Sequence, residues 1–180
     1  MKTKILLLFS VVAFLAACKS NENPNISITN ADIIGTWNLT SQEITDGTMV
    51  FTVQGETISI SYSQLSKDID MTYSFSDTPK ILTIQGKQTS QTTTSFLGET
   101  SIEEENIDTD IEPIEDATWE LNSNGTITIT EDNQPSSILT IKEFSGNYLK
   151  LTAEINETAT DTDSQESITF SAMMSIVLEK

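Results

Sequence analysis

The most regular feature of the chain is an alternation of apolar and polar residues that begins near Ile33 and continues to the C-terminus. A period of two predicts strands with one buried face and one solvated face. It argues against a parallel sheet covered on both sides, whose strands are continuously apolar. The clearest runs are residues 58–62, 71–75, 119–121, 127–129, 149–155 and 168–178.

Turn residues separate these runs. Asn124-Gly125 is the most specific signal and predicts a hairpin between 119–122 and 126–130. Weaker signals lie at residues 46–47, 54–55, 77–79 and 145–147. No stretch of helical length has a period of 3.6. A single helical turn is expected over residues 30–34, with Asn30 as its cap and Gly35 as its left-handed stop.

The pattern therefore predicts an all-β, antiparallel domain with about nine or ten short strands, either a barrel or a sandwich. Residues 30–180 are enough for a single hydrophobic core. Residues 99–116 interrupt the alternation with nine acidic side chains, which repel one another and bury little apolar surface. We expect an acidic loop there, and a second one over residues 157–166.

The N-terminus has a different character. Lys2 and Lys4 precede an apolar run over residues 5–17, a pattern typical of a secretory signal peptide. The run is shorter than the roughly 20 residues of a membrane-spanning helix. The sequence Leu-Ala-Ala-Cys ending at Cys18 resembles the lipobox of bacterial lipoproteins. That resemblance implies cleavage after residue 17, lipidation of Cys18 (including palmitate) and a flexible tether over residues 18–29.

Composition narrows the possible functions. The chain has 180 residues, with 27 acidic residues, 9 lysines, no His and a net charge of -18; it has no Arg. A field of this sign repels nucleic acid. Without His, neither a Ser-His-Asp triad nor a His-based metal site can form. The single Cys excludes an internal disulfide, and nothing in the sequence indicates a cofactor.

Several segments resemble bacterial lipocalin-like lipoproteins of the Bacteroidota type. Gly35 and Trp37 match the Gly-x-Trp step that opens the first strand of that family, and residues 117–121, 139–141 and 146–151 follow the rhythm of its second half. The resemblance implies a single up-and-down antiparallel barrel of about eight strands, or 8–10 with the segments counted here, around an internal cavity. Lipocalins commonly pack an Arg across the first-strand Trp, and this chain has no Arg.

The apolar faces of the predicted strands carry the large side chains that could line such a cavity. They could equally form a packed core, since a Trp in the opening strand commonly closes the barrel floor. Met and aromatic side chains would suit an apolar ligand, because they adapt to its shape. The candidates for core or cavity are Trp37, Tyr62, Tyr73, Phe75, Trp119, Phe170 and Met174.

Acidic residues offer two further kinds of site. The segments 108–112 and 161–163 contain closely spaced oxygen ligands, but neither has the Gly and Glu that an EF-hand requires at its sixth and twelfth positions. Solvated charge is therefore favoured over loop-bound calcium, and no metal site is predicted. No pair of carboxyl groups stands out as catalytic, so we expect a protein that is not an enzyme.

Together these observations predict a monomeric lipoprotein held at a membrane by the lipid on Cys18. The lipoprotein resemblance implies the bacterial outer membrane, on its periplasmic face or at the cell surface, because Lys19 is not the Asp that favours inner-membrane retention in lipoproteins of the enterobacterial type. The barrel would bind a small apolar or amphipathic ligand. The alternative is an interaction module that binds a partner protein or a glycan through its exterior or its acidic loops, with calcium as an added possibility.

Overall fold

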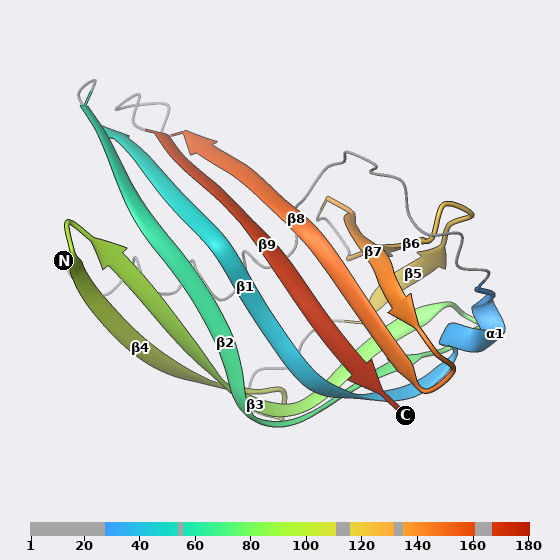
Figure 1. The fold of residues 1–180 in the computed structure, drawn as a ribbon. Helices are drawn as coiled ribbons and strands as arrows, with labels where there is room; N and C mark the ends of the chain where they lie inside the picture. Colours follow the sequence, from blue (N-terminus) through green and yellow to red (C-terminus); the bar gives the residue numbers. More distant parts are fainter. Residues whose placement is uncertain (1–27, 54–55, 111–115, 132–134, 161–166) are drawn as a thin grey trace.

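The computed structural model of the chain describes residues 28–53, 56–110, 116–131, 135–160 and 167–180. Cys18, the signal segment and most of the expected tether lie outside these residues. One short helix and nine strands account for most of the described chain (Figure 1). They are α1 (Asn30–Ile33), β1 (Gly35–Val53), β2 (Glu56–Phe75), β3 (Ile81–Phe96), β4 (Glu99–Asp108), β5 (Ala117–Leu121), β6 (Thr126–Thr130), β7 (Ser137–Phe144), β8 (Tyr148–Thr160) and β9 (Ser167–Glu179).

The strands form one antiparallel sheet that closes in a ring. Their order is β2-β1-β9-β8-β7-β6-β5-β3-β4, and β2 also pairs with β3. Strands β4 and β5 both pair with β3, the first along residues 87–96 and the second only at Ile81 and Leu82. They therefore follow each other along one side of β3. The all-β, antiparallel prediction is confirmed.

The ring is closed at one end and open at the other. Strands β5, β6 and β7 are short, and in the described residues β8 pairs with β7 only as far as Thr152. Beyond that point the strands β4-β3-β2-β1-β9-β8 continue as an open sheet whose edges are β4 and β8. Figure 1 shows these long strands extending away from α1 and the C-terminus, which lie at the closed end.

Irregular residues bend the long strands, and the sheet keeps the same inner face on both sides of each bend. The pairing of β1 with β2 shifts near Asp46, and that of β2 with β3 shifts at Asp68; both aspartates have positive φ. Gly86 has φ +118, and a Cβ there would lie 2.1 Å from the carbonyl oxygen of Asp70. Only glycine fits this close approach. Such bulges bend a strand and increase its twist, which is how a sheet curves.

A single hydrophobic core fills the closed end. Trp37 is fully buried, and its Nε1 donates a 2.7 Å hydrogen bond to the carbonyl of Ile33. Trp119 donates in the same way to the carbonyl of Ser76 at 2.8 Å and meets the ring of Phe75 edge-on at 5.5 Å. Both indole N–H groups are thus satisfied within the core, as burial requires.

Two of the smaller predictions made from the sequence can be compared directly with the structure. The hairpin at Asn124-Gly125 is confirmed, since Leu121 pairs with Ile127 and Gly125 has φ 75. The helical turn near residue 30 is also present, but its cap is Thr29 rather than Asn30. The backbone N–H and the hydroxyl of Thr29 both donate to a carboxylate oxygen of Asp32 at 2.8 and 2.7 Å. Its C-cap is Ile34, and Gly35 follows with φ +120, the left-handed conformation expected of the stop residue.

The expected acidic loop over residues 99–116 is wrong for its first part, because residues 99–108 form strand β4. The reason is its partner: β4 pairs along its whole length with β3, whose Ser, Thr and Gln side chains tolerate charged neighbours. Likewise, strand β8 continues through residues 157–160 of the second expected loop. In the described part of the chain, no helix has the length and apolar character needed to cross a membrane.

Candidate functional site: the inner face of the open sheet

The strand register defines one continuous inner face, which we take as the face that carries the core of the closed end. Along β9, every second residue from Leu178 back to Ile168 lies on this face, because β8 and β9 pair without a break. The same face continues across the other long strands through their paired residues. We call the part beyond the closed ring the open inner face.

Two rows of apolar residues cross the open inner face. Residues 60, 49 and 170 are paired across β2, β1 and β9, and residues 58, 51 and 168 form the next row outward. The inner row is better covered than the outer one: Met49 is buried, whereas Ile168 is 41% exposed. The core thus continues outward as a partly exposed strip. We define this apolar strip as Met49, Phe51, Ile58, Ile60, Phe170 and Ile168.

Tyr62 borders the apolar strip and links it to polar side chains. Its ring meets Phe170 edge-on, with centroids 5.3 Å apart. Its hydroxyl donates a 2.7 Å hydrogen bond to Oε1 of Gln64, whose Nε2 donates in turn to the hydroxyl of Ser90. Burial raises the pKa of Tyr62, a hydrogen bond with Thr92 opposes this, and the nearby charge of Glu105 raises the pKa further.

A polar belt lies between the apolar strip and the closed end. We define it as Gln42, Gln64, Ser66, Gln88 and Ser90, whose register positions all place them on the inner face. Gln88 is 6% exposed and Ser66 is 8% exposed, yet among the described residues neither Oε1 of Gln88 nor Oγ of Ser66 has a hydrogen-bond partner. Buried polar atoms without partners are uncommon and costly, and they are expected where a ligand completes the site.

Carboxylates stand on both sides of the strip. On β4, Glu103 and Glu105 pair with Thr92 and Ser90, so they lie on the inner face. On β8, Glu157 pairs with Phe170. One carboxylate oxygen of Glu157 is buried without a hydrogen-bond partner in the described part of the chain, and burial raises the pKa of this group. We call these three residues the acidic walls.

The candidate residues predicted from sequence separate into two groups. Trp37, Tyr73, Phe75, Trp119 and Met174 belong to the packed core of the closed end. Tyr62 and Phe170 are only partly buried, and they lie together on the open inner face. The sequence placed all seven on apolar strand faces, and it offered no signal to divide them.

A further residue at the closed end was missed by the sequence analysis. The Nζ of Lys180 lies 4.2 Å from the centre of the Trp37 ring, and it donates 3.2 Å hydrogen bonds to the carbonyls of Asp32 and Ile34. The last residue of the chain thus joins the end of β9 to α1 and the first strand. The polar belt was missed as well. Its Gln and Ser side chains look like ordinary polar residues of a strand, and only the pairing of β1, β2 and β3 brings them together.

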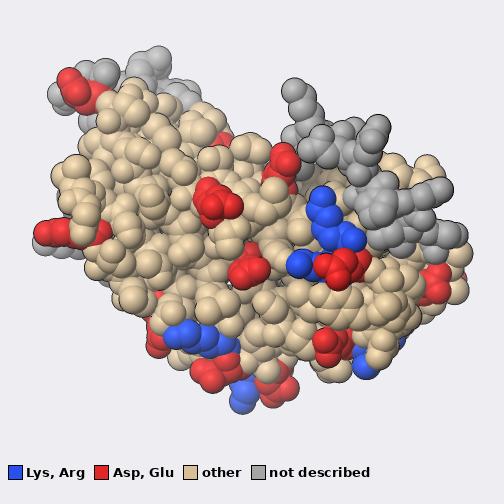
Figure 2. Space-filling model, viewed as in Figure 1, with Lys and Arg blue, Asp and Glu red and all other residues tan. Residues whose placement is uncertain are grey.

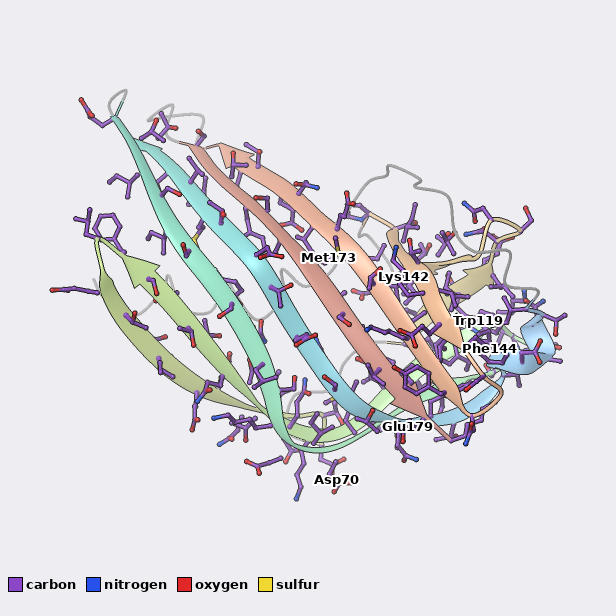
Figure 3. The ribbon with its side chains drawn as sticks, in the orientation of Figure 1. Asp70, Trp119, Lys142, Phe144, Met173 and Glu179 are labelled. Carbon is purple, nitrogen blue, oxygen red and sulfur yellow. The ribbon has the colours of Figure 1, made fainter. Side chains whose placement is uncertain are left out.

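Two hollows lie elsewhere on the molecule, and most of the residues that line them are polar. One, of about 470 Å³, is lined mainly by Ser and Thr side chains around Asp46 and Tyr62; another, of about 270 Å³, lies beside Lys80 and Trp119. Figure 2 shows that the acidic side chains on the visible face are scattered rather than gathered into one patch. In Figure 3 the labelled side chains of Met173 and Lys142 lie on the long strand β9 and the short strand β7.

No group of three or more Asp, Glu, Cys or His side chains in the described residues could hold a metal ion. Asp108 and Asp110 are within these residues, whereas Glu112 and residues 161–163 are not. Comparisons with protein-family models, with curated proteins and with solved structures gave no match to this chain.

Proposed function

We propose that the chain is a lipid-anchored protein of the bacterial outer membrane whose open inner face binds a small amphipathic molecule without catalysis. The observation that carries the binding role is the apolar strip, which leads out of the core and ends at exposed side chains such as Ile168. A polar belt with unpartnered buried atoms lies directly beside it. Apolar lining with a few convergent polar groups is the usual composition of a small-molecule site.

The expected position of the ligand differs from that in a lipocalin-like barrel with a central cavity. Trp37 and Tyr73 are packed within the core at the closed end. The open inner face offers apolar surface that is still partly accessible, so the ligand is placed there. The lipocalin-like resemblance is supported by Lys180, which stands over Trp37 where lipocalins commonly have an Arg.

Binding can be tested with a series of linear alcohols of eight, ten and twelve carbons, with affinity measured by calorimetry. Each buried methylene contributes about 0.8 kcal/mol, so affinity should rise by up to about fourfold per methylene. Native mass spectrometry of the gently purified protein would show whether a small molecule is already bound.

A matched pair of variants locates the site. Ile168 is 41% exposed on the open inner face, and Leu65 is 45% exposed on the outer face. Ile168→Gln should weaken binding about tenfold, because it places an amide against the tail. Leu65→Gln should leave binding unchanged. Equal losses in both variants, or no binding of any alcohol, would contradict the proposal.

The anchor is tested separately, because Cys18 lies outside the described residues and its support comes from the sequence alone. Cys18→Ser should release the protein from membranes and abolish incorporation of radioactive palmitate. Persistent labelling of this variant would show that the lipid is attached elsewhere and would contradict lipidation of Cys18.

A further inference from the structure

The charges around the apolar strip are of one sign. Glu103 and Glu105 lie on the inner face of β4, and Glu157 lies on the inner face of β8. On the long strands, Lys67, Lys87 and Lys150 alternate with inward-facing residues and so lie on the outer face. Lys180 lies at the closed end, over Trp37, and not on the open inner face. A ligand on this surface therefore meets carboxylates with no lysine among the described residues of the open inner face to neutralise them.

The unpartnered oxygens of the polar belt also favour a ligand that donates hydrogen bonds. The unpartnered atom of Gln88 is its carbonyl oxygen Oε1, which can only accept a hydrogen bond. Its Nε2 donates a 3.5 Å hydrogen bond to Oε1 of Gln42. The hydroxyl of Ser66, also unpartnered in the described residues, can accept as well. Ser66 pairs with Ser90, and Ser90 pairs with Glu105, so belt and wall share one row of the sheet.

We propose that the ligand is a cationic amphiphile, with a protonated amine as its head group and a single aliphatic tail. The ammonium donates to Gln88 and Ser66 and faces Glu105 and Glu103, while the tail lies along the apolar strip. An ammonium has three donors and no acceptor, which matches the carbonyl oxygen of Gln88 and the carboxylates of Glu103 and Glu105, all of which only accept; the Ser66 hydroxyl can accept as well. A carboxylate head would instead bring acceptors against acceptors and like charge against like charge. This inference rests on the proposed function, because it names the class of ligand for the same face.

The test compares three probes with the same twelve-carbon tail: dodecylammonium, dodecanol and dodecanoate, each below its micelle concentration at pH 7. Calorimetry with the full protein should rank their affinities in that order, with dodecylammonium about tenfold tighter than dodecanol because its hydrogen bonds are charge-assisted. The difference in affinity between dodecylammonium and dodecanol should become smaller as the salt concentration is raised, because Glu103 and Glu105 are exposed and their charges are screened.

Two variants separate a specific head-group site from general attraction by a protein of net charge -18. Glu105→Gln should reduce the preference for dodecylammonium over dodecanol about fivefold. Glu104→Gln is the matched control: it removes the same charge from the outer face of the same strand, where Glu104 forms an exposed salt bridge with Lys67 at 3.2 Å. It should leave the preference unchanged.

A third variant, Gln88→Met, tests the buried acceptor while keeping the length of the side chain. It should weaken the binding of dodecylammonium about fivefold and that of dodecanol less, since a neutral hydrogen bond is the weaker one, without lowering the melting temperature, because it removes an unpartnered buried oxygen. A loss of dodecanol binding together with a lower melting temperature would assign Gln88 a structural role and count against the inference.

The outcomes for this inference and for the proposed function differ. If all three probes bind equally, or dodecanoate binds best, the cationic head group is refuted and an amphiphile-binding face remains. If Glu104→Gln and Glu105→Gln have the same effect, the preference reflects overall charge and the head-group site is refuted. If none of the probes binds, both the inference and the proposed function fail.

Discussion

The contact between Lys180 and Trp37 leads to a quantitative prediction about the closed end. The ammonium lies 4.2 Å from the ring centre, while the ring itself is fully buried. A cation–π contact contributes about 0.5–1 kcal/mol at exposed sites and about 2 kcal/mol when desolvated. Lys180 is exposed on its other side, so a coupling of about 1 kcal/mol with Trp37 is expected.

The perturbation is the substitution Lys180→Met, which keeps an apolar stem over the ring and removes the charge. It also removes the hydrogen bonds to the carbonyls of Asp32 and Ile34, so the total loss should be about 1–2 kcal/mol. For a domain of this size, 1 kcal/mol corresponds to a change in melting temperature of about 2–4 °C. Lys142→Met is the control, because Lys142 is exposed on β7 (Figure 3) and should change stability by less than about 0.5 kcal/mol.

A double-mutant cycle isolates the ring contact. Urea unfolding of the wild type, Lys180→Met, Trp37→Phe and the double variant gives the coupling energy, and the cost of losing the indole hydrogen bond cancels between the two sides of the cycle. Phe binds a cation less well than Trp, so part of the coupling should be lost in Trp37→Phe. A coupling energy below about 0.3 kcal/mol would refute the contact as a stabilising interaction.

Two further predictions concern the core and its bends. Gly86→Ala should destabilise the fold by about 2–5 kcal/mol in urea unfolding, because a Cβ would lie 2.1 Å from the Asp70 carbonyl oxygen; Gly146→Ala, with no atom within 4 Å, should cost about 1–2 kcal/mol from its positive φ alone. Equal costs would contradict the steric argument. Burial raises the pKa of Tyr73 to about 12 from 10.0, so the folded state holds its proton longer than the unfolded state. The contribution of Tyr73 to the free energy of unfolding should therefore be fully present below pH 10 and fall by about 1.4 kcal/mol per pH unit between about pH 10 and 12. Tyr73→Phe should reduce this slope, and an unchanged slope would show that other groups cause it.

Alternation along the chain was a reliable guide wherever a strand had no bulge. The file from residue 168 to 178 predicted the inner face of β9, because that strand pairs with β8 without a register shift. The runs 58–62 and 71–75 were also correct in phase, but they belong to one strand, β2, joined across the bulge at Asp68. A bulge changes the phase of the alternation, so a continuous bent strand reads as two short ones.

Residues 99–108 show why composition misled the prediction. A segment with many acids has little tendency to form a strand in isolation, since it cannot bury apolar surface. In the folded chain it needs only the backbone hydrogen bonds of β3, and its side chains remain exposed. Strand propensity depends on neighbours of this kind more than on the segment itself.

The sequence by itself determined that the chain is all-β, which residues share a strand face, and that its charge is strongly negative. Whether the strands close, and where, was decided by tertiary structure: the ring is complete only where β5 meets β3 at Ile81 and Leu82. The placement of Ser66, Ser90 and Glu105 on one row, with Gln88 on the neighbouring row, likewise depends on the register between successive strands. Register is set by bulges and by packing of the core at long range, and a local pattern carries no information about either.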